Sequence, residues 1–253
     1  MKSPKLNLAI FLMLGFITLN TAGQEKKEQL WYCWEETVKP AYLDDYFAMS
    51  KELIGICKQE KFPYAFITLT SKPFIYELWY PVNSLNDVPE IDKAWEKVIE
   101  KFGTEKYAAF NNTKVKNSSY STSGRTDLNY DPKNPDFSRD EAGGTFWKLY
   151  SLIPGKEKEF EEAVKWMNGQ RESAGVGHYI GYVIGGVGFD DPLFAEGNSA
   201  VSQEDFLKRT SDMDIKMATV LREFNRRIYS ITREKKEFFQ WQLKDLSYQP
   251  EAK

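Results

Sequence analysis

Residues 146–160 read FWKLYSLIPGKEKEF, and this stretch decides how we interpret the fold. Its first eight residues are rich in aromatic and aliphatic side chains, which favours a β-strand. Pro154 and Gly155 then form a turn, and an acidic run follows in which Phe160 and Met167 begin an apolar stripe with helical spacing. The stretch therefore predicts a strand, a tight turn and an amphipathic helix.

The same order occurs earlier in the chain. Residues 30–34 (LWYCW) predict a strand, Pro40 ends it, and a helix with Tyr46 on its apolar face follows. Pro40 precedes Pro154 by 114 residues, and Tyr46 precedes Phe160 by the same interval. The two helical stripes are therefore in phase.

The later parts of the two halves also correspond. A strand is predicted over 64–70 and another over 178–184, and serine-led helix starts at Ser84 and Ser202 follow. The endings DLNYDP and DLSYQP, like the two serines, are separated by 118 residues. The change in spacing falls at the glycine-rich run 185–188, which we interpret as an enlarged hairpin. Four matches in the same order favour an internal duplication.

Each half is interpreted as strand, helix, strand, strand, helix, strand, which is the ferredoxin-like plan. Such a sheet carries helices on one face, and its other face must also be covered. We therefore predict an α+β protein of two tandem ferredoxin-like βαββαβ units, packed sheet to sheet as a pseudo-dimeric α+β barrel. The expected segments are a signal peptide (1–23), a first unit (24–130), a linker (131–144) and a second unit (145–253).

The strand, the Pro-Gly-Lys turn and the acidic helix start of residues 149–160 resemble the corresponding part of NIPSNAP-like proteins. The tandem layout resembles the dimeric α+β barrel superfamily, which also includes antibiotic-biosynthesis-type and haem-degrading monooxygenases. This resemblance implies a barrel with an apolar cavity for a small aromatic or haem-like ligand. The asparagine, tryptophan and histidine that haem-degrading members use together have no matching motif in this sequence, so no catalytic residues are carried over.

The first 23 residues are typical of a secretory signal peptide. Lys2 and Lys5 precede an apolar stretch over 6–19, and small residues follow it. About 20 apolar residues are needed to span a bilayer, so this stretch is short for a membrane anchor. The sequence predicts an exported protein, periplasmic or extracellular, with no transmembrane span in the mature chain.

Composition excludes several classes of function. The chain has 253 residues, 34 of them basic and 37 acidic, and its net charge of −3 argues against nucleic-acid binding. One histidine and two cysteines are too few for a cysteine/histidine zinc site. Aromatic residues make up 15%, enough to form a substantial core.

Export permits a disulfide between Cys33 and Cys57, the only cysteines. Cys33 lies in the first predicted strand and Cys57 on the stripe of the helix that follows. A bridge is reasonable if that helix packs over its own strand. Two buried free thiols are the equal alternative.

Four residues are candidates for ligand binding. His178, the only histidine, is predicted to face the same way as Tyr182, and could bind haem or carry a proton. Glu77 lies between apolar residues in its strand, next to Trp79 on the same face, and could bond a ligand. The alternatives are a carbonyl-bonded histidine and an internal ion pair or solvent contact for Glu77. Asp127, with Asn129 and Asp131, resembles the start of a calcium loop, but proline stands where that loop needs glycine, and we expect no metal site.

No pairing of nucleophile and base is evident, so we expect a non-catalytic protein that binds a small apolar or aromatic molecule, as a monomer or homodimer. The alternative is a monooxygenase-like enzyme, cofactor-free or haem-dependent. No cofactor is expected under the first interpretation. A carbohydrate-binding module is a second alternative, since the seven tryptophans could stack on sugars.

Overall fold

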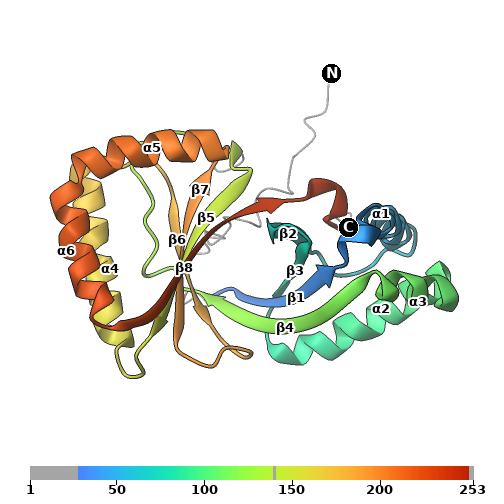
Figure 1. Ribbon diagram of the computed structural model, residues 1–253. Helices are drawn as coiled ribbons and strands as arrows, with labels where there is room; N and C mark the ends of the chain where they lie inside the picture. The colour runs from blue at the N-terminus through green and yellow to red at the C-terminus, as the bar shows by residue number, and fades with distance from the viewer. Residues whose placement is uncertain (1–27, 139–140, 251–253) are drawn as a thin grey trace, which may run out of the picture. The chain divides into compact units, whose positions relative to one another are not determined.

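Figure 1 shows a computed structural model of the chain, which describes residues 28–138 and 141–250. The protein is α+β, as predicted, and each half contains four strands and three α-helices. The predicted signal peptide, residues 1–23, lies outside the described residues.

The first half begins with a strand and a long helix, as the aromatic run and the apolar stripe predict. Its elements are β1 (Leu30–Val38), α1 (Leu43–Gln59), β2 (Ile67–Lys72), β3 (Ile75–Val82), α2 (Val88–Phe102), α3 (Thr104–Asn112) and β4 (Lys114–Gly124). Ser84 and Asp87 form a capping box ahead of α2, in which each side chain bonds the other residue's backbone N–H.

The second half repeats this order. Its elements are β5 (Gly144–Leu152), α4 (Glu157–Ala174), β6 (Ile180–Gly185), β7 (Leu193–Ala200), α5 (Gln203–Lys216), α6 (Ala218–Tyr229) and β8 (Thr232–Gln242). Ser202 caps α5 by accepting a hydrogen bond from the backbone N–H of Asp205. The serine-led helix starts are therefore confirmed in both halves.

The strands are hydrogen-bonded in the order β1-β3-β2-β8-β5-β7-β6-β4, and this order closes because β4 also pairs with β1. The pairs β1–β3, β1–β4, β2–β3, β2–β8, β5–β7 and β6–β7 are antiparallel.

The chain forms two compact units, and each contains a segment from the other half. The N-unit comprises Gln29–Ser123, Gly185–Gly188 and the chain from Gln240 onward. The C-unit comprises Glu28, Gly124–Ile184 and Phe189–Phe239. Tyr130 of the first half exchanges two backbone hydrogen bonds with Ile180 in the C-unit. Tyr248 of the second half does the same with Phe66 in the N-unit.

Each unit has its own core between a sheet face and the helices that cover it. In the N-unit, α1 and α2 pack on the face that carries Tyr76 and Tyr80. In the C-unit, α4 and α6 lie side by side (Figure 1). Their apolar side chains share a core with Tyr150 and Tyr182. The helical stripes predicted around Tyr46 and Phe160 form part of these cores.

Two strands belong to the predicted ferredoxin-like plan, but the sequence pattern does not locate their residues. Residues 114–124 form β4 although they are mostly polar. Residues 193–200, which include Glu196 and Asn198, form β7, and every residue in this strand is buried. Among the described residues, no helix combines the length and the apolar character needed to cross a membrane.

Candidate functional site

The N-unit contains a partly open cavity of about 330 Å³ between its sheet and its helices. Pockets of roughly 300–1,000 Å³ with apolar walls and few polar groups are typical of small-molecule sites. Aromatic side chains dominate its lining. The strands contribute Tyr32, Trp34 and Tyr80, and the helices contribute Tyr46, Trp95 and Tyr107.

Strand alternation explains why these side chains point into the cavity. Successive residues of a strand face opposite sides of the sheet, so Tyr32, Trp34 and Glu36 of β1 share one face. Tyr80 of β3 lies directly opposite Tyr32 across the strand pair, and therefore faces the same way. The aromatic run of β1 thus gives this cavity its wall on the sheet side.

A buried ion pair is one part of the polar lining of the cavity, which also includes Asp92, Glu96 and Asn117. The Nζ of Lys114 lies 2.5 Å from Oε1 of Glu36, and the side chains are only 5% and 7% exposed. The hydroxyl of Tyr46 donates to Oε2 of Glu36 at 2.8 Å, and Nε1 of Trp34 donates to Oε1 at 3.2 Å. Lys114 also donates to Oδ1 of Asn111 at 3.2 Å.

This arrangement places a carboxylate and an ammonium group in surroundings of low polarity. A carboxylate accepts about four hydrogen bonds, and Glu36 accepts three, so one position on Oε2 is open. Burial raises the pKa of Tyr46 and of Tyr80, and both phenols therefore stay protonated near neutral pH. The cavity can hold a planar apolar molecule, accept a proton at Glu36 and stabilise an oxyanion at Lys114.

Glu77 and Trp79 share the opposite face of the N-unit sheet and do not line this cavity. Trp79 Nε1 and Gln240 Nε2 donate to Oε2 of Glu77 at 2.9 and 2.6 Å. Burial raises the pKa of Glu77, although the hydrogen bonds oppose the shift. Its carboxylate is thus held by neighbouring side chains, and its role in ligand binding stays a prediction.

His178 and Tyr182 belong to the C-unit. His178 precedes β6, where the sequence predicts the strand to include it, and burial together with Arg209 and Arg171 lowers its pKa to about 3. The Tyr182 hydroxyl bonds Oε2 of Glu196, which also accepts from Arg171 at 2.9 Å. The two candidates therefore lie in a buried polar cluster, and their binding role stays a prediction.

Glu196 remains ionised within this cluster. Burial alone would raise its pKa, but Arg171, Lys148 and hydrogen bonds from Tyr182 and Asn198 outweigh that effect and lower it well below the usual range. The cluster therefore contains a carboxylate that is firmly paired with cations.

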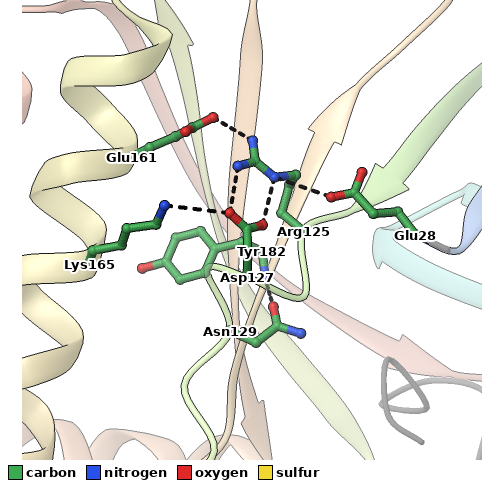
Figure 2. Close-up of polar contacts among 7 residues, drawn as sticks. All are labelled: Glu28, Arg125, Asp127, Asn129, Glu161, Lys165 and Tyr182. Carbon is green, nitrogen blue, oxygen red and sulfur yellow. Dashed lines mark hydrogen bonds and ion pairs between the residues drawn. The ribbon is translucent and has the colours of Figure 1, made fainter. Parts of the chain in front are cut away.

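Asp127 and Asn129 connect the end of the first half to the C-unit. Arg125 donates two hydrogen bonds to Asp127 at 2.8 Å and contacts Glu161 at 2.5 Å (Figure 2). The side-chain oxygen of Asn129 accepts the backbone N–H of Tyr182 at 2.8 Å. The oxygens that resemble a calcium loop therefore hold this segment against α4 and β6.

Of the two alternatives for the cysteines, the structure has the second, because Cys33 and Cys57 are buried free thiols. Cys33 lies opposite Trp79, on the sheet face away from the helices. Cys57 points from α1 into the core on the other face. The bridge requires both cysteines on one face, which the alternation of β1 does not allow.

Neither Glu36 nor Lys114 is among the site residues predicted from the sequence. Glu36 shares the alternation of Tyr32 and Trp34, which is a usable signal. Lys114 has none, because it is buried in a polar strand whose next residue, Val115, is 67% exposed.

A haem group fits the N-unit cavity poorly, because neither histidine, cysteine nor methionine lines it. Haem iron takes an axial ligand from histidine, cysteine, methionine or tyrosine. His178 is 5% exposed and does not line the N-unit cavity. Burial raises the pKa of the four tyrosines that line the N-unit cavity, which opposes ligation as tyrosinate.

No family model and no curated protein matches the sequence, whereas solved structures match the fold. A "putative monooxygenase" from Fusobacterium nucleatum has a TM-score of 0.56 and 11% identity, over 86% of this chain and 93% of that one. An anthrone oxidase-like protein has a TM-score of 0.54 and 10% identity, over 86% and 92%. A mutant chlorite dismutase from Candidatus Nitrospira defluvii has 0.54 and 9%, over 85% and 92%.

At these identities the likeness establishes a shared ferredoxin-like α+β barrel fold. The proteins that share it are described as monooxygenase, oxidase-like and dismutase. Our interpretation of a non-catalytic binding protein is therefore wrong, and the comparisons support the monooxygenase-like alternative.

Proposed function

We propose that this protein is a monooxygenase-like enzyme that needs no cofactor and oxidises a small aromatic substrate in the N-unit cavity. The Glu36–Lys114 pair at the buried polar side of an aromatic cavity carries this proposal. Proteins of the same fold described as a monooxygenase and as anthrone oxidase-like support the reaction class.

The aromatic walls select a flat, apolar substrate. Aromatic rings gain about 0.5–1.5 kcal/mol from stacking or edge contacts beyond the area they bury. Tyr80 is held in place by the hydrogen bond that it accepts from Trp95 at 3.1 Å. A substrate ring therefore packs against side chains that are already held in place, which reduces the entropy lost on binding.

Glu36 and Lys114 supply the acid–base chemistry. The open lone pair of Glu36 removes a proton from an acidic C–H beside the ring, and the Lys114 ammonium stabilises the resulting enolate oxygen. The enolate transfers electrons to O₂ and forms a carbon–oxygen bond, giving a peroxide that takes up the proton. Loss of water from this peroxide converts the CH₂ group to a ketone, so one O₂ yields one ketone and one water.

We also infer that the two halves arose by duplication of a NIPSNAP-like unit. The Tyr130 hydroxyl donates to the carbonyl of Val176 at 2.7 Å, and the Tyr248 hydroxyl donates to that of Phe62 at 3.0 Å. Each tyrosine also exchanges two backbone hydrogen bonds with one residue, Tyr130 with Ile180 at the start of β6 and Tyr248 with Phe66 just before β2. The repeated endings thus perform the same structural task in each unit. Export through residues 1–23 is part of the same proposal.

The proposed activity can be tested with anthrone as the probe. An oxygen electrode is expected to record protein-dependent O₂ uptake with anthrone, and ultraviolet spectra to record the quinone. Glu36→Gln lowers the rate by about 10²–10⁴-fold, the usual contribution of a general base. Glu52→Gln is the matched control, because Glu52 pairs with Lys106 at 2.6 Å on the surface and does not line the cavity.

A second variant covers the risk that Glu36→Gln impairs folding. Leu78→Trp adds bulk on a half-buried lining residue and is expected to block the cavity while circular dichroism stays unchanged. Anthrone oxidation at the uncatalysed rate, or equal rates in folded wild type and both cavity variants, would refute the proposed activity.

A further inference from the structure

The C-unit has a cavity of its own, of about 310 Å³, between its sheet and the helices α4 and α6. Its chemistry differs from that of the N-unit cavity, because four basic side chains line it. These are Lys148 on β5, Arg171 on α4, Arg222 on α6 and Lys235 on β8.

Acidic groups neutralise only part of this charge. Glu196 lies 2.9 Å from Arg171 and 3.4 Å from Lys148, and Glu237 lies 2.6 Å from Lys235. Four cations therefore face two carboxylates, neither of which lines the cavity. Neutral His178 adds no charge, since its pKa is lowered by burial and by the surrounding cations. An anion entering the cavity meets a positive environment.

Arg171 has a buried donor that remains unused. Its side chain is 3% exposed, and its Nη atoms donate to Asn168, Tyr182 and Glu196. The Nε atom is buried and has no hydrogen-bond partner. Native proteins rarely leave such a donor unsatisfied, because its desolvation is then uncompensated. A hydrogen-bond acceptor on a ligand in the cavity would satisfy this Nε donor.

Apart from Asn225, the remaining lining residues are aliphatic or aromatic. Tyr150 and Met167 are almost fully buried, and Phe224 and Leu221 pack against the same core. Arg222 is exposed, so this basic side chain is reachable from solvent. Such a lining favours a ligand with a flat apolar body and one acidic group over an inorganic ion.

We propose that the C-unit cavity binds a small aromatic anion, with its carboxylate or phosphate held by Lys148, Arg222 and Lys235 and within reach of Arg171. The site is separate from the proposed catalytic cavity, whose Glu36–Lys114 pair carries no net charge. The two proposals can therefore fail independently.

Titration calorimetry with benzoate, phenyl phosphate and inorganic phosphate tests this inference on the whole protein. At least one aromatic anion is expected to bind more tightly than inorganic phosphate, with an affinity that falls as salt rises. Lys148→Gln and Arg222→Gln each weaken binding about tenfold or more, the usual effect of losing a charge-assisted hydrogen bond. Neither change removes the Arg171–Glu196 pair, so both variants are expected to fold.

Arg226→Gln is the matched control, because Arg226 lies on α6, pairs with Glu223 at 2.9 Å and does not line the cavity. It is expected to bind as wild type does. Glu36→Gln should also bind normally, which separates this site from the catalytic proposal. Absence of binding by both aromatic anions, binding no tighter than that of phosphate, or equal affinity in Lys148→Gln, Arg222→Gln and wild type would overturn the inference.

Discussion

The only histidine of the chain gives a direct test of the electrostatics in the C-unit. His178 is buried, and burial with Arg209 and Arg171 lowers its pKa from the ordinary 6.5 to about 3. The fold therefore favours the neutral imidazole, whereas the unfolded chain protonates it near pH 6.5. The resulting contribution to stability is complete above pH 6.5 and is lost as the pH falls from there toward 3.

The size of the effect follows from the two pKa values. Each pKa unit corresponds to about 1.36 kcal/mol. Between pH 7 and pH 5, His178 becomes protonated in the unfolded state but stays neutral in the folded state. The free energy of unfolding therefore falls by about 2 kcal/mol. No other histidine contributes in this window.

The perturbation is His178→Gln, which stays neutral at every pH. Urea unfolding of wild type and variant, followed by tryptophan fluorescence at pH 7, 6 and 5, measures the two slopes. A difference in unfolding free energy between wild type and variant that is the same at every pH reports only lost packing. The readout is therefore how this difference changes with pH. The variant should lose about 2 kcal/mol less than wild type over this range. Parallel curves would refute the claim that His178 is buried in its neutral form.

Three further predictions concern stability. Lys114→Met leaves Glu36 as an unpaired buried charge and should lower the free energy of unfolding by about 3–5 kcal/mol. Glu36→Leu combined with Lys114→Met should lower it less, and a urea titration in which the double variant is less stable than Lys114→Met would contradict this. Tyr130→Phe and Tyr248→Phe each leave a buried carbonyl without its hydrogen bond and should cost about 1–3 kcal/mol by the same assay, and a marked inequality would argue against equivalent roles. Gly188→Ala should cost about 1–3 kcal/mol in thermal unfolding, because φ is +97° there and the added Cβ would lie 2.9 Å from a neighbouring side chain; an unchanged Tm would contradict it.

The helices of this fold are largely predictable from the sequence. The stripe through Tyr46, Leu53 and Cys57 follows one face of α1, and all three residues are buried. Ser84 and Ser202 cap the helices that they are predicted to begin. These features are local, since a helix and its cap form within a few residues of chain.

The strands β4 and β7 could not be predicted in the same way. Lys114 and Glu196 are buried in them because each has a partner of opposite charge, Glu36 at 78 residues' distance and Arg171 at 25. Without that partner a buried charge is prohibitively unfavourable, so the residue alone predicts exposure. Hydropathy therefore predicts exposure for a charged residue that is in fact buried wherever a residue distant in sequence compensates its charge.

By itself, the sequence determines the order of elements, the repeated helix starts and tyrosine endings, and the alternation that puts Tyr32, Trp34 and Glu36 on one face of β1. Tertiary structure alone decides what that face meets. It brings Lys114 onto Glu36, separates Cys33 from Cys57 by the thickness of a sheet, and surrounds His178 with cations. The reason is physical: periodicity follows from backbone geometry within one element, whereas the pairing of buried charges depends on which distant elements pack together.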